Sequence, residues 1–139
     1  MARTTFSGPV VSQNGFIIDH TPGSANAINA TATATAAQVA TGYITSTSAA
    51  ATAITMPTGT LLGAALAATQ GTVFDLFIDN TAGASTVTIV VATNGVLSSA
   101  AVDSAASFGD LTIAAGATGL ACFRIMFSSA TAYAFTRTA

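Results

Sequence analysis

Residues 73–91 read VFDLFIDNTAGASTVTIVV, and the rest of the chain is interpreted around this stretch. Two runs rich in β-branched and aromatic residues flank a short Asn/Gly/Ser segment, which predicts a β-hairpin. Alternation gives each run one apolar face, made of Phe74, Leu76 and Ile78 in the first run and of Val87, Ile89 and Val91 in the second. On the first run, Asp75, Phe77 and Asp79 take the opposite face. Such strands cannot stand alone in water, so the remaining chain must supply a second apolar surface.

Further short strands are expected on both sides of this stretch. Residues 43–48, 51–56 and 111–113 are weak strand candidates, and residues 120–127 and 132–137 form a strong C-terminal hairpin pattern. The residues of that hairpin that share an apolar face are Phe123, Ile125, Phe127, Tyr133 and Phe135. Seven or eight short strands separated by frequent turn signals predict an all-β fold, a β-sandwich or a jelly-roll-like barrel.

The sequence offers one good helix candidate, at about residues 58–70. Thr58 or Thr60 caps its start, leucines and alanines at 3–4 spacing form an apolar stripe, and Gly71 is the expected left-handed C-cap. Residues 29–36 alternate Ala and Thr with period two, which favours a strand. A helix over residues 34–40 is the alternative there, because Ala is the best helix former.

The chain of 139 residues corresponds to one domain, and its charge content is very low. Only 6% of its residues are charged (five Asp, three Arg, no Glu and no Lys), against about 25% in average proteins. So few charges give little electrostatic protection against self-association. Either this is a small β-domain with a Thr/Ser surface, or partner subunits cover much of the surface in a permanent assembly. We prefer the second interpretation.

Residues 1–30 differ from the remainder and are interpreted as an extended arm, with residues 31–139 as a single β-domain. Isolated apolar anchors alternate there with the turn dipeptides Gly8-Pro9 and Asn14-Gly15. A free N-terminal tail is the bland alternative, but the segment is too apolar for one. The arm residues expected to contact a neighbouring surface are Arg3, Phe6, Pro9, Val10, Val11, Phe16, Ile17 and Ile18.

No pattern for chemistry emerges, so no catalytic, cofactor-binding or metal-binding residues are predicted. His20 follows Asp19, but no activated nucleophile accompanies them. Asp75 and Asp79 lie on one strand face about 13 Å apart, which is too far to share an ion. Cys122 is expected to be a small buried hydrophobe. Arg124 either pairs with Asp75 or Asp79 across the sheet or faces solvent or a neighbouring subunit.

Several partner classes are also not expected. The three arginines are scattered and the net charge is -2, which argues against nucleic-acid binding. No apolar run reaches the ~18–20 residues of a membrane span, and no secretory signal is recognised. A lone cysteine fits synthesis in a reducing compartment.

Two parts of the sequence carry a resemblance. The opening TTFSGPV of residues 4–10, continued by Asn14-Gly15-Phe16, resembles the start of small head proteins of tailed bacteriophages. The pattern of Ile54 to Pro57, Gly71, Phe74, Phe77, Asn80-Thr81, Val87-Thr88, Phe123, Tyr133 and Phe135 resembles the β-domain of phage capsid decoration (cement) proteins and some phage fibre proteins.

This resemblance implies a structural virion protein and no enzyme. Such a protein is made in the bacterial cytoplasm and binds the major capsid protein on the outer surface of an icosahedral head. It acts there as a homo-oligomer, a trimer, whose arms cross onto neighbouring subunits and stabilise the expanded shell. The alternative is a head-fibre or tail-fibre adhesin module that binds host surface glycans.

Overall fold

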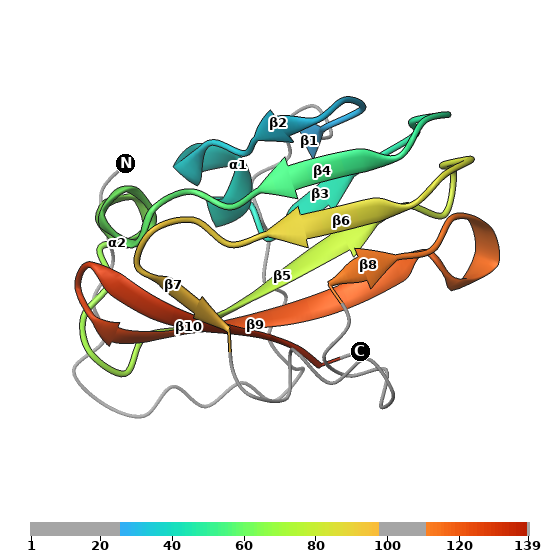
Figure 1. Cartoon of the computed structure of the whole chain (residues 1–139). Helices are drawn as coiled ribbons and strands as arrows, with labels where there is room; N and C mark the ends of the chain where they lie inside the picture. The colour runs from blue at the N-terminus through green and yellow to red at the C-terminus, as the bar shows by residue number, and fades with distance from the viewer. Residues whose placement is uncertain (1–25, 98–110, 139) are drawn as a thin grey trace, which may run out of the picture.

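The computed structural model describes residues 26–97 and 111–138, which form two β-sheets and two short helices (Figure 1). Sheet A has the strand order β1-β3-β5-β9-β10-β7 and sheet B the order β2-β4-β6-β8. The strands are β1 (Asn26–Ala27), β2 (Ala32–Thr33), β3 (Tyr43–Thr45), β4 (Thr52–Thr55), β5 (Val73–Asp79), β6 (Val87–Val90), β7 (Gly95–Leu97), β8 (Thr112–Ile113), β9 (Leu120–Ser129) and β10 (Ala132–Arg137). The helices are α1 (Ala36–Ala40) and α2 (Gly59–Leu66), with a 3-10 turn at Gly116–Thr118. Both sheets mix parallel and antiparallel pairs and stay open. Of the predicted all-β fold, the structure confirms the coarser class, a mainly-β protein with two short helices.

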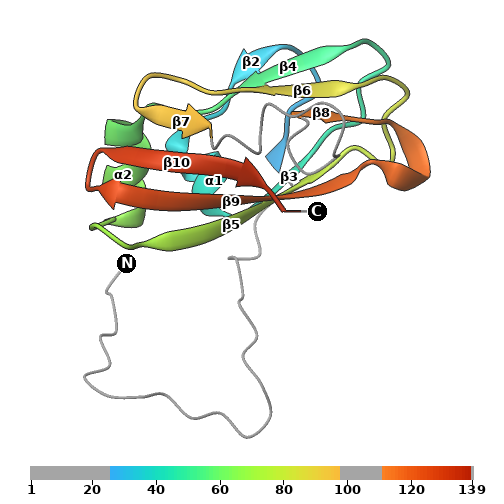
Figure 2. The ribbon, with the colours of Figure 1, turned by 60° about the horizontal axis from the view of Figure 1, so that its bottom comes forward.

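The two sheets lie over one another, with sheet B above sheet A in Figure 2. Their inward side chains form one buried cluster to which β5, β6 and β9 contribute heavily. Leu76 and Ile78 of β5 are fully buried, as predicted. Val87 and Ile89 of β6 are also buried, with at most 1% of their surface exposed. The predicted inward faces of these strands are therefore confirmed.

The predicted pairing of residues 73–79 with 87–91 as a hairpin is wrong. β5 pairs with β3 and β9 in sheet A, whereas β6 pairs with β4 and β8 in sheet B. Two hairpin strands would present their apolar faces on the same side of one sheet. In the two-sheet arrangement these faces belong to opposite layers, so each run provides the apolar surface that the other needs.

Asn80 anchors the connection that carries the chain from sheet A to sheet B. Its Nδ2 donates to the carbonyl oxygens of Ser85 at 2.8 Å and Ala114 at 2.9 Å, and its backbone N–H donates to Gly119 at 2.7 Å. The side chain is fully buried. These bonds tie the end of β5 to the start of β6 and to the segment between β8 and β9, so the loop crosses between the layers.

The described part of the chain contains two α-helices where the sequence predicted one. Thr35 begins α1 with a capping box, since its hydroxyl accepts from the Gln38 N–H while the Gln38 side chain accepts from the Thr35 N–H. The Ala/Thr stretch is thus a strand only at β2, and its helical alternative holds from Ala36 to Ala40. Local capping outweighs period-two alternation of small side chains, which bury little area in either form.

Helix α2 is shorter than the predicted range of 58–70. Thr58 caps its start, as expected, but it ends at Ala67, which adopts the left-handed conformation at φ 45°. Gly71 was expected to be this C-cap; it lies beyond the helix, where its N–H donates to the Phe127 carbonyl. The helix stops early because residues 67–72 turn back to start β5.

The C-terminal hairpin of β9 and β10 is confirmed, with its predicted apolar faces buried. Phe123 and Phe135 stack with ring centroids 4.8 Å apart. The Tyr133 hydroxyl donates to the Pro57 carbonyl at 2.9 Å, which fixes the start of α2 to sheet A. Burial raises the pKa of Tyr133 to about 12.

The folded part described here begins within the segment interpreted as an arm. β1 pairs in parallel with β3, and Ile28 directly after it is buried. Arm residues 1–25 lie outside the described residues, so the arm stays a prediction. Among residues 26–97 and 111–138, no helix is long and apolar enough to cross a membrane.

Candidate interaction surface

The outward side of sheet A gathers most of the exposed large apolar side chains of the described residues. Tyr43, Val73, Phe77 and Leu120 are between 40% and 56% exposed, and all four come from β3, β5 or β9. Within residues 26–97 and 111–138, the other two large apolar side chains with comparable exposure are Leu61 on α2 and Val90 on β6. We call this surface the outer face of sheet A and define it by Tyr43, Val73, Asp75, Phe77, Asp79, Leu120, Cys122, Arg124 and Met126.

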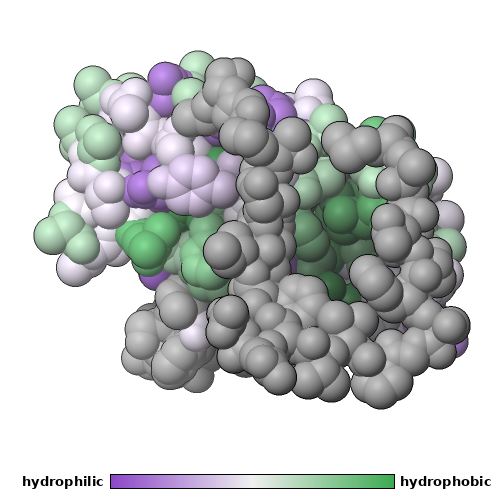
Figure 3. All heavy atoms as spheres, turned by 180° about the vertical axis from the view of Figure 1, so that it is seen from behind, coloured by the Kyte–Doolittle hydropathy of each residue, from purple (hydrophilic) through white to green (hydrophobic). Residues whose placement is uncertain are grey.

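Strand register arranges these side chains in rows that cross the sheet. One row runs from Tyr43 through Phe77 to Cys122, because these residues are Cα partners on β3, β5 and β9. The pair Asp79–Leu120 lies on one side of this row and the pair Asp75–Arg124 on the other. The aromatic row is therefore flanked by charge on both sides. Figure 3 views the molecule from this side and shows strongly apolar and strongly polar side chains next to one another.

Arg124 pairs with Asp75, one of the partners that the sequence left open. Its Nε and an Nη each donate to one carboxylate oxygen at 2.8 Å, a bidentate arrangement. The guanidinium holds the pKa of the Asp75 carboxyl below its ordinary value, against partial burial that would raise it. Both side chains stay well exposed, at 47% for Arg124 and 37% for Asp75, so the pair contributes little to stability. Its main effect is to hold a charged group in one orientation on the face.

Asp79 is also held in place by its neighbours. One carboxylate oxygen accepts from the Thr81 hydroxyl at 2.6 Å and from the Thr81 N–H at 2.9 Å, and the other accepts from the Tyr43 hydroxyl at 2.5 Å. These bonds, Thr81 first, lower the pKa of the Asp79 carboxyl, and the bond to Asp79 raises the pKa of Tyr43. The hydrogen bond to Asp79 thereby restricts the orientation of the Tyr43 side chain, whose Cα partner on β5 is Phe77.

Cys122 lies on this face and is half-buried, so the prediction of a buried residue is wrong. Alternation explains the difference, since its neighbours Ala121 and Phe123 are the residues of β9 that point inward. The sequence pattern predicted the inward face of β9. The opposite face of the same strand, which carries Leu120 and Cys122, was not predicted to be a surface. Tyr43 and Val73 were also not predicted to lie on the surface. Each directly precedes an apolar residue of the inward face, Ile44 or Phe74, so alternation along the strand places it on the outer face.

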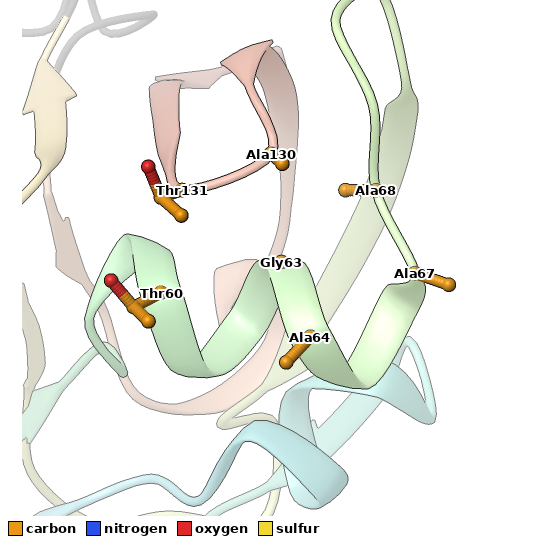
Figure 4. A pocket seen from close by; sticks show the side chains of 7 residues that line it. All are labelled: Thr60, Gly63, Ala64, Ala67, Ala68, Ala130 and Thr131. Carbon is orange, nitrogen blue, oxygen red and sulfur yellow. The ribbon is translucent and has the colours of Figure 1, made fainter.

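Two hollows lined mostly by small and apolar side chains contain no titratable group. One, of about 570 Å³, lies between α1, the β4–α2 connection and the start of α2, lined mainly by Thr and Ala with Met56 and Leu61. A second, about 420 Å³, lies between α2 and the β9–β10 turn (Figure 4). No group of three or more His, Cys, Asp or Glu side chains comes together in residues 26–97 and 111–138.

Beside the second hollow, two glycines of α2 pack directly against the β9–β10 turn. A Cβ at Gly63 would lie 1.9 Å from the Ala130 carbonyl oxygen, and one at Gly59 would lie 2.1 Å from that of Thr131. Figure 4 shows only small side chains around this contact. We interpret it as close helix packing and not as a ligand site.

The predicted contact residues Arg3, Phe6, Pro9, Val10, Val11, Phe16, Ile17 and Ile18 all lie outside the described residues. Comparison with known proteins adds no identification: the chain matches no protein-family model, and no curated protein or solved structure is detectably similar to it.

Proposed function

We propose that the chain is a non-enzymatic structural protein that decorates the outside of an icosahedral phage head. Its two sheets form a β-sandwich of jelly-roll-like type, and it binds the major capsid protein as a homo-oligomer, with three copies expected. The observation that carries this proposal is the outer face of sheet A, an exposed apolar and aromatic surface on a nearly uncharged domain. Exposed contiguous apolar surface of this kind marks protein–protein contact more often than catalysis.

The charge distribution supports the same proposal. Among residues 26–97 and 111–138 only Asp75, Asp79, Arg124 and Arg137 have charged side chains, and the first three lie on this face. Each of those three already has a partner within the chain. Pre-paired charges lose less on desolvation than isolated ones, so the face can be covered by protein at modest cost.

The proposed mechanism is mass action. A protein that binds the expanded shell and not its precursor stabilises the expanded shell by its binding free energy. Several linked copies add avidity, because one bound copy raises the effective concentration of the others. Residues 1–25 serve as the arm that reaches onto neighbouring subunits.

The test is co-sedimentation of the purified full chain with heads of the phage that encodes it, stripped of their decoration. We expect saturable binding to expanded heads and little binding to unexpanded ones. Deleting residues 1–18 is expected to leave the β-domain folded, as judged by circular dichroism, and to abolish attachment. Absence of saturable binding by the intact chain would reject the proposal, and full occupancy by the deletion variant would reject the arm.

A second candidate is a head-fibre or tail-fibre adhesin module for host glycans. The neighbouring rings of Tyr43 and Phe77 beside the Asp79 carboxylate favour it, because sugars stack on exposed aromatic rings and bond to carboxylates. A glycan array probed with the full chain separates the candidates: specific sugar binding without affinity for heads would favour the adhesin.

A further inference from the structure

The hollow of about 570 Å³ between the two neighbouring helices is large enough for a small cluster of side chains (Figure 1). We call it the α1–α2 groove and define it by Ala34, Met56, Pro57 and Leu61, which are among its lining residues. The first three are buried, whereas Leu61 has 60% of its surface exposed. None of the described residues that line the groove is charged. Its chemistry therefore suits an apolar occupant.

The chain itself contains a suitable occupant outside the described residues. Residues 1–25 include one run of three consecutive large apolar residues, Phe16-Ile17-Ile18. Removing such side chains from water is favourable in proportion to the apolar area that is covered. We propose that Phe16-Ile17-Ile18 binds in the α1–α2 groove of its own chain. One contact then covers both this run and the exposed side chain of Leu61.

The described fold begins close to this groove. Asn26 is the first described residue, and its Nδ2 donates to the Thr41 Oγ1 at 2.7 Å. Thr41 ends helix α1, while Ala36 at the opposite end of the same helix lines the groove. Five residues of helix span about 7.5 Å, which places Asn26 on the order of 10–15 Å from the groove.

This short span favours the chain's own segment over a separate partner. Ile18 precedes Asn26 by eight positions. A flexible connection of eight residues has a root-mean-square length of about 16 Å, which matches the span. A connection whose length matches the span gives an effective concentration in the millimolar range. A second copy or another protein at micromolar concentration competes with this local segment at a large disadvantage.

The contact does not depend on binding to phage heads. It assigns Phe16, Ile17 and Ile18 to the domain of their own chain and leaves residues 1–15 for the neighbouring surface. The experiments below use the purified chain without heads, whereas the proposed function is tested by co-sedimentation with heads. Either proposal can therefore fail while the other holds.

Disulfide trapping in the full chain tests the contact. In a Cys122→Ser background, Asp19→Cys places a thiol directly after the apolar run, and Thr33→Cys places another among the residues that line the groove. A disulfide forms only where the two Cα atoms approach within about 7 Å. Under mild oxidation of a dilute solution, we expect a disulfide within the monomer, measured by mass spectrometry as the loss of both thiols.

The matched control replaces Thr33→Cys by Thr47→Cys. Thr47 is also exposed and lies three positions after Ile44, the Cα partner of Asn26, so it is about 10 Å from Asn26. The same connection reaches Thr47, which does not line the groove. We expect at least about tenfold slower disulfide formation in the control. Equal rates in both variants, or disulfides that join two chains instead of closing within one, would overturn the proposal.

Proteolysis of the chain without added cysteines gives a second measurement. Chymotrypsin cleaves after aromatic residues, and a bound Phe16 should be cleaved slowly. Leu61→Ser removes the exposed leucine of the groove and should speed cleavage after Phe16 at least about fivefold. The matched control is Leu120→Ser, because Leu120 is 51% exposed and lies on the outer face of sheet A. The proposal is rejected if cleavage after Phe16 is equally fast in both variants.

Discussion

Asn80 provides the sharpest test of why residues 73–91 cross between the sheets. Replacing it by Ala removes the hydrogen bonds that Nδ2 donates to the carbonyls of Ser85, Ala114 and Ile113, at 2.8, 2.9 and 3.4 Å. Each such bond contributes about 1 kcal/mol net, and the buried Ile113 carbonyl left without this donor adds to the cost. The buried Asn80 Oδ1 has no hydrogen-bond partner among the described residues. Its desolvation already offsets part of the stability that the Nδ2 hydrogen bonds provide. We expect a loss of about 2–3 kcal/mol in the free energy of unfolding.

This loss corresponds to a decrease of about 10 °C in the melting temperature, since 1 kcal/mol shifts a domain of this size by roughly 4 °C. Circular dichroism on the purified full chain measures it. The control is Asn29→Ala, because Asn29 is exposed and accepts one hydrogen bond from the Thr47 N–H. That variant should lose less than about 1 kcal/mol.

Asn80→Asp tests the direction of the hydrogen bonds, because it keeps the side-chain shape and replaces the donor by an acceptor. At neutral pH a buried carboxylate facing carbonyl oxygens should destabilise the protein more than Asn80→Ala does. Burial raises the pKa of the new carboxyl in the folded state, so its stability deficit should shrink as the pH falls and grow as the pH rises. The reasoning fails if Asn80→Asp is as stable as the unchanged chain, or if its deficit does not vary with pH.

Three further predictions address other contacts. Gly63→Ala should lower stability by about 1–3 kcal/mol in thermal melts despite the better helix propensity of Ala, because the new Cβ meets a turn carbonyl; Gly63→Ala as stable as the unchanged chain would contradict this packing. Absorbance titration should show Tyr133 ionising near pH 12, with stability lost as the pH rises from about 10 towards 12, and Tyr133→Phe should remove this step; two tyrosines that both ionise near pH 10 would argue against the burial. The lowered pKa values of Asp75 and Asp79 contribute stability that is present above the ordinary carboxyl pKa range and is lost as the pH falls below it. In the double variant Asp75→Asn/Asp79→Asn, the free energy of unfolding should therefore fall slightly less steeply as the pH is lowered. A steeper fall would refute this.

Much of the fold was predictable because local alternation carries it. The inward faces of β5, β6, β9 and β10 follow from period-two patterns of large apolar residues, and the C-terminal hairpin follows from its short turn. The helix start at Thr58 was also readable from its capping residue. Where small side chains dominate, as in residues 29–40, both periods bury similar area, and the boundary between β2 and α1 depends on the cap at Thr35.

The candidate surface was only half predictable. The sequence placed Asp75, Phe77 and Asp79 on one side of a strand, and it named Asp75 among the possible partners of Arg124. It could not show that Tyr43 and Leu120 complete the same face, because their neighbours in the sheet are 34 and 41 positions away along the chain. Residues this distant are brought together by strand order, which leaves no local signal.

The amino-acid sequence by itself determined which side of each long strand faces inward, and it determined that the surface would carry almost no charge. Tertiary structure decided which strands are neighbours. An apolar strand face is buried equally well under any suitable partner, so pairing depends on the whole set of strands competing for the core. Residues 73–91 show the consequence: two runs that look like a hairpin instead face each other from separate sheets, held by the buried amide of Asn80.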